Sequence, residues 1–337
     1  MEYAFVTGAT GLLGNNVVRA LLKRNIKVKA LVRSVEKARK QFGSLPVELV
    51  EGDMLNVDAF SHALQGCDAL FHTAAYFRDS YKGGKHWQKL YDTNVVGTER
   101  LLQAAYDAGI RRAVHTSSIA VLKGNRDQVI DETMSRSELE ADDYYLSKIL
   151  SEQKVQQFLA EHPDMFVAMV LPGWMFGPGD IGPTSSGQFL LDFVGQKLPG
   201  VLPGSFSVVD ARDVAEHQIA AITRGRSGER YLAAGNHMDM KSIFQALSNV
   251  SGIKAPERKV PLFMLRIIAL IYEGYYRITK KPVLISTSTV KLMEQEQGRT
   301  HFSHSKSARE LECKFRPVAE TLTDTLNWYR NNNYTDA

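Results

Sequence analysis

The chain has 337 residues, of which 44% are hydrophobic and 23% are charged, and its formal net charge is +4. This composition lies close to the globular average, which excludes a disordered or low-complexity chain. The length is about twice that of a typical domain of roughly 150 residues, so we expect one large α/β unit or a core with a smaller lobe. The mild positive charge forms no basic stripe, and we therefore expect no nucleic-acid partner.

Cysteine usage and hydropathy narrow the compartment and the class of protein. Cys67 and Cys313 lie far apart without metal-ligand spacing, so we expect neither a disulfide framework nor a metal site. The first residues lack a basic segment followed by a long apolar run, which argues against a secretory signal. No apolar run reaches the roughly 20 residues of a membrane-spanning helix. We expect a cytoplasmic monomer or homodimer without a transmembrane span.

Short β-branched apolar runs alternate with amphipathic stretches through the first half of the chain. We expect strands at Tyr3–Thr7, Lys27–Arg33, Val47–Glu51, Ala69–Thr73, Ala113–Ser117 and Phe166–Leu171. Helices are expected near 12–24, 56–64, 86–108 and 142–161. This alternation is typical of right-handed βαβ units and predicts an α/β fold with a Rossmann-type, doubly wound parallel sheet.

The second half has a different texture. A stretch rich in Gly and Pro at 172–187 predicts a boundary between a dinucleotide-binding domain at 1–178 and a smaller, mainly helical substrate lobe at 179–337. Strand-like pieces at Phe206–Val209 and Arg230–Ala233 could return to the main sheet. Helical periods occur near 211–224, 240–250, 261–277 and 318–330.

The apolar segment 261–276 allows two interpretations. Its basic flanks, which include Lys280 and Lys281, would suit an amphipathic helix on a membrane surface. Its apolar side chains fall on more than one helical face, which favours a helix buried between the second lobe and the sheet. We therefore predict from the sequence that the segment does not bind membranes.

A glycine-rich turn, Gly8-Ala9-Thr10-Gly11-Leu12-Leu13-Gly14, directly follows the first expected strand and precedes an amphipathic helix. Glycines at this place let backbone N–H groups approach a pyrophosphate at the positive end of the helix. The second strand then ends at Arg33 without a carboxylate, and Lys40 lies on the next helix. An arginine at this place accepts a 2′-phosphate, so we expect NADP(H) as the cofactor.

A second group of residues carries proton-transfer chemistry. Tyr144 and Lys148 are four residues apart on one face of an expected helix, where the ammonium group favours the phenolate. Ser118 lies just after the fifth strand, at the edge where doubly wound sheets bind ligands. Asn94 is a poor helix former within an expected helix; it is either a water ligand or a local irregularity.

These motifs, in this order, resemble the extended short-chain dehydrogenase/reductase family over essentially the whole chain, and most closely its dihydroflavonol reductase-like aldehyde and ketone reductases. The matching segments are the glycine turn, Gly52-Asp53, His72–Ala75, Asn94–Thr98, Thr116–Ser118, Tyr144–Lys148, Leu171–Pro178 and Asp213–Ala215. The resemblance implies that Ser118 orients a carbonyl, with Ser117 as the less favoured neighbour. It also implies that Tyr144 is the acid, Lys148 its partner and Asn94 a relay residue.

The resemblance further implies a set of cofactor contacts. They lie in the glycine turn, after the second, third and fourth strands, on the Tyr144 helix and beside the nicotinamide: Gly8, Thr10, Gly11, Leu12, Leu13, Gly14, Arg33, Lys40, Asp53, Met54, Thr73, Ala74, Ala75, Tyr144, Lys148, Pro172, Gly173 and Met175. Thr73 departs from the family, in which Asn or Val is common, so we expect a backbone contact there.

The leading hypothesis is an NADPH-dependent reductase of an aldehyde or ketone, with an apolar or aromatic substrate. The alternatives are an enzyme like the 3β-hydroxysteroid dehydrogenases, a nucleotide-sugar epimerase or dehydratase, and a non-catalytic NADP-sensing protein. The sequence after Ser118 lacks the acidic pair of a dehydratase, and the intact catalytic residues argue against a sensor. Aromatic residues could line the substrate pocket or simply pack in the core: Tyr76, Phe77, Trp87, Trp174, Phe176 and Phe189.

Overall fold

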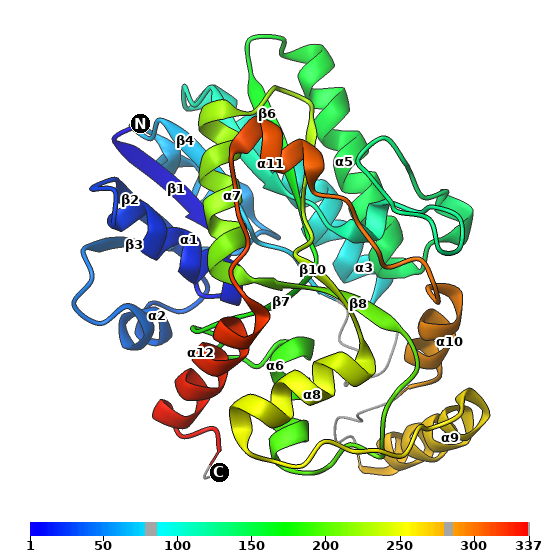
Figure 1. The fold of residues 1–337 in the computed structure, drawn as a ribbon. Helices are drawn as coiled ribbons and strands as arrows, with labels where there is room; N and C mark the ends of the chain where they lie inside the picture. Colours follow the sequence, from blue (N-terminus) through cyan, green and yellow to red (C-terminus); the bar gives the residue numbers. More distant parts are fainter. Residues whose placement is uncertain (78–85, 280–285, 336–337) are drawn as a thin grey trace.

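The large sheet is parallel throughout and has seven strands. The computed structural model describes residues 1–77, 86–279 and 286–335 (Figure 1). The strand order is β3-β2-β1-β4-β5-β6-β9, so the connection reverses direction between β1 and β4, as in doubly wound folds. The strands are β1 Tyr3–Thr7, β2 Lys27–Val32, β3 Val47–Glu51, β4 Ala69–His72, β5 Arg112–Thr116, β6 Phe166–Pro172 and β9 Arg230–Ala233. This confirms the predicted Rossmann-type α/β fold.

Helices cover both faces of this sheet because successive strand side chains point to opposite sides. Val6 packs with α1, α2 and α7, whereas its neighbour Phe5 packs with α4. The helices of this layer are α1 Leu12–Leu22, α2 Val35–Phe42, α3 Trp87–Leu90, α4 Gly97–Asp107, α5 Asp143–Glu161, α7 Ala211–Arg224 and α11 Ser305–Leu311.

The second lobe contains a smaller sheet with the order β10-β8-β7 and its own apolar core. Its strands are β7 Trp174–Phe176, β8 Ser205–Asp210 and β10 Asn236–Asp239. Its helices are α6 Ser185–Val194, α8 Met240–Ser251, α9 Leu262–Thr279, α10 Thr287–Gln295 and α12 Val318–Asn331.

The structure refines several expectations about individual elements. The piece at 230–233 pairs with β6 in the large sheet, whereas the piece at 206–209 is the central strand of the small sheet. The expected helix at 56–64 is instead two short 3₁₀ turns, η1 Val57–Ala59 and η2 Ser61–Leu64. A π-helical turn, η3 Tyr91–Val96, interrupts the helix expected at 86–108. The domain boundary at residue 178 stays a prediction, since the chain returns to the large sheet after it.

The surface of α9 contradicts the prediction that this helix is buried. One face packs on the second lobe, where Leu265 and Ala269 are fully buried. On the opposite side Phe263 and Ile271 are each 63% exposed. The sequence shows that the helix has apolar side chains on two faces, but it does not show which face packs against the rest of the protein. The prediction that both faces are buried was therefore wrong.

No helix within the described ranges combines the length and the apolar content needed to cross a bilayer. Lys280 and Lys281, which flank the apolar segment in the sequence, lie outside the described residues.

Candidate active site

The glycine turn after β1 forms a tight cradle. Gly8 has a φ of +64°, and a Cβ there would lie 2.7 Å from the backbone nitrogen of Ala74. A Cβ on Gly14 would lie 2.2 Å from the carbonyl oxygen of Gly8. α1 begins after Gly11 with no side-chain cap and no acidic residue in its first turn. Its first N–H groups and its positive end therefore suit a pyrophosphate, and the cradle fits a dinucleotide.

Three other predicted residues of this turn differ in exposure. Thr10 is half-buried, and its carbonyl oxygen accepts a hydrogen bond of 3.2 Å from the side chain of Gln41. Leu12 and Leu13 are buried. Their side chains serve packing, so only their backbone could contact a cofactor.

The predicted cationic residues lie beyond the end of β2. Arg33 directly follows β2 and is exposed, and it forms no ion pair with any described residue. Ser34 then caps α2 by accepting a hydrogen bond from the backbone nitrogen of Lys37. Lys40 lies in the last turn of α2 and pairs with Glu36 over 2.9 Å. Lys40 therefore has an acidic partner, whereas Arg33 has none among the described residues.

The residues after β3 form an ordered turn. A hydrogen bond of 3.0 Å from the nitrogen of Gly52 to the carbonyl oxygen of Val32 extends the contact between β2 and β3. Asp53 accepts a hydrogen bond of 2.9 Å from the nitrogen of Leu55 through Oδ1, and Met54 is buried. The carboxylate of Asp53 is thus held at the carboxyl edge of the sheet, where its adenine contact remains a prediction.

The segment Thr73–Ala75 runs from β4 across the glycine turn. The hydroxyl of Thr73 donates a hydrogen bond of 2.6 Å to the carbonyl oxygen of Thr7. The nitrogen of Ala74 donates to the hydroxyl of Thr7 over 3.2 Å, and Ala75 is exposed. The side chain of Thr73 therefore has a partner inside the protein, which leaves its backbone for the predicted cofactor contact.

The two neighbouring tyrosines at the start of α5 have different surroundings. Asp142 caps the helix by accepting hydrogen bonds of 3.0 Å from the backbone nitrogens of Tyr144 and Tyr145. The ring of Tyr144, 8% exposed, meets the ring of Phe77 edge-on with centroids 4.7 Å apart. The ring of Tyr145 packs under the guanidinium group of Arg136, 4.7 Å away. Tyr145 is therefore a packing residue, and Tyr144 shares its helix face with Lys148.

Lys148 links α5 to the carboxyl end of β5. Its Nζ donates a hydrogen bond of 2.9 Å to the carbonyl oxygen of Thr116, the last residue of β5. The side chain is buried, and this burial lowers the pKa of Lys148 to about 8, while the carboxylate of Glu152 acts in the opposite direction. The ammonium group is thus fixed beside the strand end that leads to Ser118.

The two serines after β5 have different surroundings. Ser118 is half-buried, and its Oγ accepts a hydrogen bond of 3.1 Å from the nitrogen of Ala120. Ala120 packs against Tyr144, which brings the Ser118 turn next to that tyrosine. Ser117 is 2% exposed, and its Oγ has no hydrogen-bond partner among the described residues, although it lies near Glu152 and acts to lower the pKa of that carboxyl group. The geometry therefore favours Ser118 over Ser117 as a contact for a substrate.

Asn94 lies in the π-helical turn η3 and connects three segments. Its Oδ1 accepts a hydrogen bond of 2.7 Å from the nitrogen of Tyr76, and its Nδ2 donates to the carbonyl oxygen of Tyr76 over 2.9 Å. Nδ2 also donates to the hydroxyl of Ser147, which in turn donates to the carbonyl oxygen of Tyr144. Asn94 thus braces the backbone at Tyr144, and the local irregularity and a site role coincide in this residue.

The segment after β6 approaches the small sheet closely. A Cβ on Gly173 would lie 2.5 Å from the carbonyl oxygen of Ser207 in β8 and 2.4 Å from that of Ala234 after β9, so only glycine fits there. Pro172 ends β6, and Met175 lies in β7, where its carbonyl oxygen accepts a hydrogen bond from the hydroxyl of Ser186. The structure therefore places this segment at the carboxyl edge of the large sheet, between the two lobes.

Two buried histidines that were not predicted as site residues pack against each other behind the site. His72 and His115 face each other on β4 and β5 with ring centroids 5.3 Å apart. His72 contacts the hydroxyls of Thr7 and Thr98, at 2.8 and 2.9 Å. Burial, together with the nearby charge of Lys148, lowers the pKa of His72 to about 3 and that of His115 well below its usual value. Both rings are therefore neutral at physiological pH.

A buried ion pair joins α5 to the last strand of the sheet. Glu152 is 3% exposed and forms an ion pair with Arg230 of β9, with 2.6 Å between the charged groups. Burial raises the pKa of Glu152, and the charge of Arg230 opposes this rise. Tyr144, Lys148 and Glu152 follow one another at intervals of four residues, a spacing that could have identified Glu152 from the sequence.

The predicted aromatic residues fall into two groups. Phe77 is 51% exposed and contacts Tyr144, the ring of Tyr76 packs against His86, and the ring of Trp87 packs against Tyr91. Trp174, Phe176 and Phe189 instead pack together in the core of the second lobe, with centroids 4.8 and 5.1 Å from Trp174. Core packing is therefore the explanation for this second group.

Comparison with known proteins agrees with this geometry. The sequence profile of the NAD dependent epimerase/dehydratase family matches residues 4–234. The chain belongs to this family. It is an extended short-chain dehydrogenase/reductase, and its family and relatives are oxidoreductases that act on hydroxyl and carbonyl groups with a nicotinamide cofactor.

Relatives in the family cover nearly the whole chain. A Synechocystis sp. protein provisionally named dihydroflavonol 4-reductase is 32% identical, over 98% of this chain and 95% of its own length. Sterol demethylase protein B of Methylococcus capsulatus is 35% identical, over 96% of this chain and 97% of its own length. The crystal structure of gox2253 is 31% identical and covers 100% of both chains with a TM-score of 0.84.

Proposed function

We propose that this family member is an NADPH-dependent reductase that converts an aldehyde or a ketone to an alcohol, with Tyr144 as the proton donor. The observation that carries the proposal is the position of Lys148. Its ammonium group donates a hydrogen bond to the last residue of β5. Lys148 lies on the same face of α5 as Tyr144, and the Ser118 turn packs beside that tyrosine through Ala120. A bound nicotinamide cofactor supplies the hydride for such a reaction.

The residues of the site then have complementary tasks. Ser118 accepts a hydrogen bond from Ala120, so its own proton is left to hold the substrate carbonyl oxygen. Tyr144 donates its proton to the same oxygen as negative charge develops there. The charge of Lys148 favours the phenolate that remains, and Asn94 holds the backbone of this helix turn through Ser147.

Arg33 supports NADPH over NADH. It stands exposed at the end of β2 without an ion-pair partner among the described residues, whereas the predicted Lys40 pairs with Glu36. A guanidinium group at this position can hold a 2′-phosphate through two hydrogen bonds. The family description names NAD, and the structure of yeast methylglyoxal/isovaleraldehyde reductase Gre2, which has a similar fold, is a complex with NADPH.

An apolar or aromatic substrate suits the entrance to the site. The exposed ring of Phe77 meets Tyr144 directly, which puts an apolar surface beside the proton donor. One relative is provisionally named a dihydroflavonol 4-reductase and another a sterol demethylase protein, and both names refer to ring compounds.

A substrate panel tests the proposal. We expect NADPH oxidation with aromatic aldehydes, aliphatic ketones or ketosteroids, and none with a nucleotide sugar. The same panel with NADH should give much slower turnover. Conversion of a nucleotide sugar without net consumption of cofactor would instead show an epimerase. Tight NADPH binding with no turnover of any carbonyl compound would favour a sensor protein.

A further inference from the structure

The outer side of α9 carries a continuous apolar surface. We use the term α9 apolar face for its exposed members, which recur at the spacing of one helical side: Phe263, Ile267, Leu270, Ile271, Tyr275 and Ile278. Each of these side chains is between 46% and 86% exposed. The inner side of the same helix is buried on the second lobe through Leu265 and Ala269. The helix is thus already anchored by one apolar face and presents a second one to solvent.

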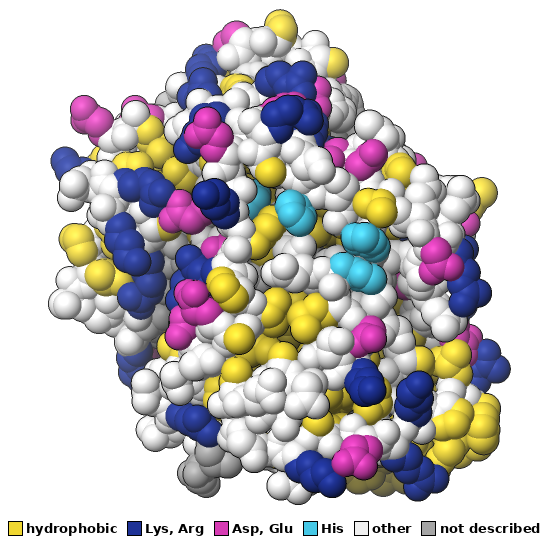
Figure 2. Space-filling view, viewed as in Figure 1, with side chains coloured by type: hydrophobic (Ala, Val, Ile, Leu, Met, Phe, Trp, Pro, Cys, Tyr) yellow, Lys and Arg dark blue, Asp and Glu magenta, His cyan; other side chains and the backbone are white. Residues whose placement is uncertain are grey.

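Positive charge is concentrated in the sequence segment that contains α9. Residues 254–294 contain eight of the 41 Lys and Arg residues of the chain and three of its 37 Asp and Glu residues. The rest of the chain therefore contains 33 basic and 34 acidic residues, so the whole positive excess lies in this segment. We expected a mild positive excess that forms no basic stripe, whereas the excess lies in this one segment of the chain. Figure 2 shows hydrophobic side chains flanked by Lys and Arg at the lower right, where Figure 1 places α9.

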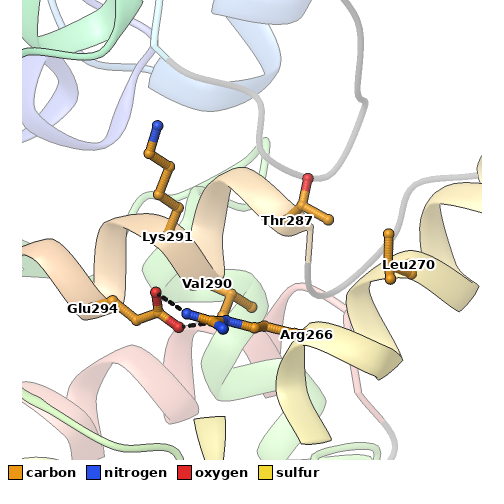
Figure 3. A pocket seen from close by; sticks show the side chains of 6 residues that line it. All are labelled: Arg266, Leu270, Thr287, Val290, Lys291 and Glu294. Carbon is orange, nitrogen blue, oxygen red and sulfur yellow. Dashed lines mark hydrogen bonds and ion pairs between the residues drawn. The ribbon is translucent and has the colours of Figure 1, made fainter. Parts of the chain in front are cut away.

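Three cations next to the α9 apolar face lack an acidic partner in the part of the chain that the structure describes. Arg258 and Lys259 precede the helix and are exposed, and Lys291 is exposed on α10. Arg266 differs, because it pairs with Glu294 across the hollow between α9 and α10 at 2.8 Å. Figure 3 shows Lys291 extending away from that pair.

We propose that the α9 apolar face binds the surface of a lipid bilayer that contains anionic lipids. In this position the apolar side chains enter the boundary between headgroups and acyl chains, while Arg258, Lys259 and Lys291 contact anionic headgroups. A second copy of the chain fits this face less well, since two copies would bring two surfaces of the same positive charge together. The proposal is independent of the reductase activity.

Vesicle co-sedimentation at several salt concentrations tests the proposal. We expect the protein to bind phosphatidylcholine vesicles containing phosphatidylserine, and to bind pure phosphatidylcholine vesicles at least about tenfold more weakly. Added salt should weaken the binding by screening the cations. No binding to the anionic vesicles, or equal binding to both kinds, would overturn the proposal.

Matched variants locate the contact. Ile267→Ser with Ile271→Ser should reduce binding roughly tenfold or more, and so should Arg258→Gln with Lys259→Gln. The controls are Leu55→Ser with Leu139→Ser, which alters exposed apolar residues elsewhere, and Lys23→Gln with Lys197→Gln, which removes two exposed charges elsewhere. Equal loss in the controls would overturn the assignment to α9. Circular dichroism checks that each variant is folded.

Sedimentation velocity without lipid separates a bilayer partner from a second copy. If α9 binds lipid, the oligomeric state of the protein should be the same for the wild type and for Ile267→Ser with Ile271→Ser. A dimer that this variant dissociates, together with absent vesicle binding, would show that the α9 apolar face is a contact between copies of the chain.

Discussion

The Nζ of Lys148 donates a hydrogen bond to the carbonyl oxygen of Thr116 over 2.9 Å inside the protein. Burial lowers the pKa of this lysine to about 8, and Glu152, one helical turn further along α5, acts to raise it. The group that supports Tyr144 therefore changes its charge close to physiological pH. Activity should depend on this charge, because only the ammonium form stabilises a phenolate.

The first prediction concerns this pH dependence. The value of kcat/KM should fall as the pH rises through about 8, because Lys148 then loses its proton. Glu152→Gln removes the charge that raises the pKa of Lys148, so the alkaline limb should move to lower pH by roughly 0.5 to 1 unit. Glu161→Gln, an exposed change on the same helix, is the control. Identical profiles for Glu152→Gln and the wild type would contradict the coupling.

The second prediction concerns cofactor choice. Arg33→Ser should weaken NADPH binding about tenfold to hundredfold, since a hydrogen bond to a charged group contributes about 1.5 to 3 kcal/mol. NADH binding should change little, because NADH has no 2′-phosphate. Arg39→Ser removes an exposed charge from the adjacent helix and serves as the control. Fluorescence titration measures both affinities, and equal wild-type affinity for the two cofactors would refute the role of Arg33.

The third prediction concerns stability in acid. His72 and His115 stay neutral in the native state, whereas the unfolded chain binds protons at histidines with a pKa near 6.5. The free energy of unfolding should therefore decrease as the pH falls below about 6.5, by about 1.4 kcal/mol per pH unit for each such histidine. This contribution is fully present above that pH.

Urea unfolding between neutral and mildly acidic pH measures this slope. His115→Gln should reduce it by about 1.4 kcal/mol per pH unit, whatever its effect on stability at neutral pH. Gln103→Ala, at an exposed residue that does not titrate, should leave the slope unchanged. A slope unaffected by His115→Gln would show that this ring takes up a proton in the native state.

The fourth prediction concerns the substrate. Phe77→Ala removes the exposed ring that meets Tyr144, so kcat/KM for an aromatic aldehyde should fall about fivefold to tenfold. Turnover of a small aliphatic aldehyde should change less. Phe263→Ala, an exposed aromatic residue on α9, should affect neither reaction. Equal losses for both substrates with Phe77→Ala would indicate a structural role for this ring.

Short apolar runs in the sequence were sufficient to predict the strands of the main sheet. The runs that became β1 and β3 were predicted with the bounds that the structure shows. β1 is buried and apolar along most of its length, as expected of a covered parallel strand, whereas β3 is an edge strand whose Val and Leu residues are interrupted by Glu48 and Glu51. The π-helical turn at Asn94 was not predicted, since it depends on hydrogen bonds to Tyr76 and Ser147 from other segments. Short strands such as β7 and β10 were also missed, because they are defined by pairing with β8.

The candidate site was predictable where one segment carries its own signal. The glycine turn and the spacing of Tyr144 and Lys148 are of this kind. Two other features depend on how distant segments come together, which no short motif encodes. They are the hydrogen bond from Lys148 to Thr116 and the packing of His72 against His115. The exposure of α9 was misjudged for the related reason that a sequence does not show which apolar face finds a partner.

Replacement of Tyr144 tests the central claim most directly. Tyr144→Phe removes only the hydroxyl, so kcat for carbonyl reduction should fall by roughly 10²- to 10⁴-fold while the Kd for NADPH stays nearly unchanged. Tyr145→Phe, which alters the ring packed under Arg136, should keep most of the activity. Full activity in Tyr144→Phe, or a comparable loss in Tyr145→Phe alone, would contradict the assignment of Tyr144 as the proton donor.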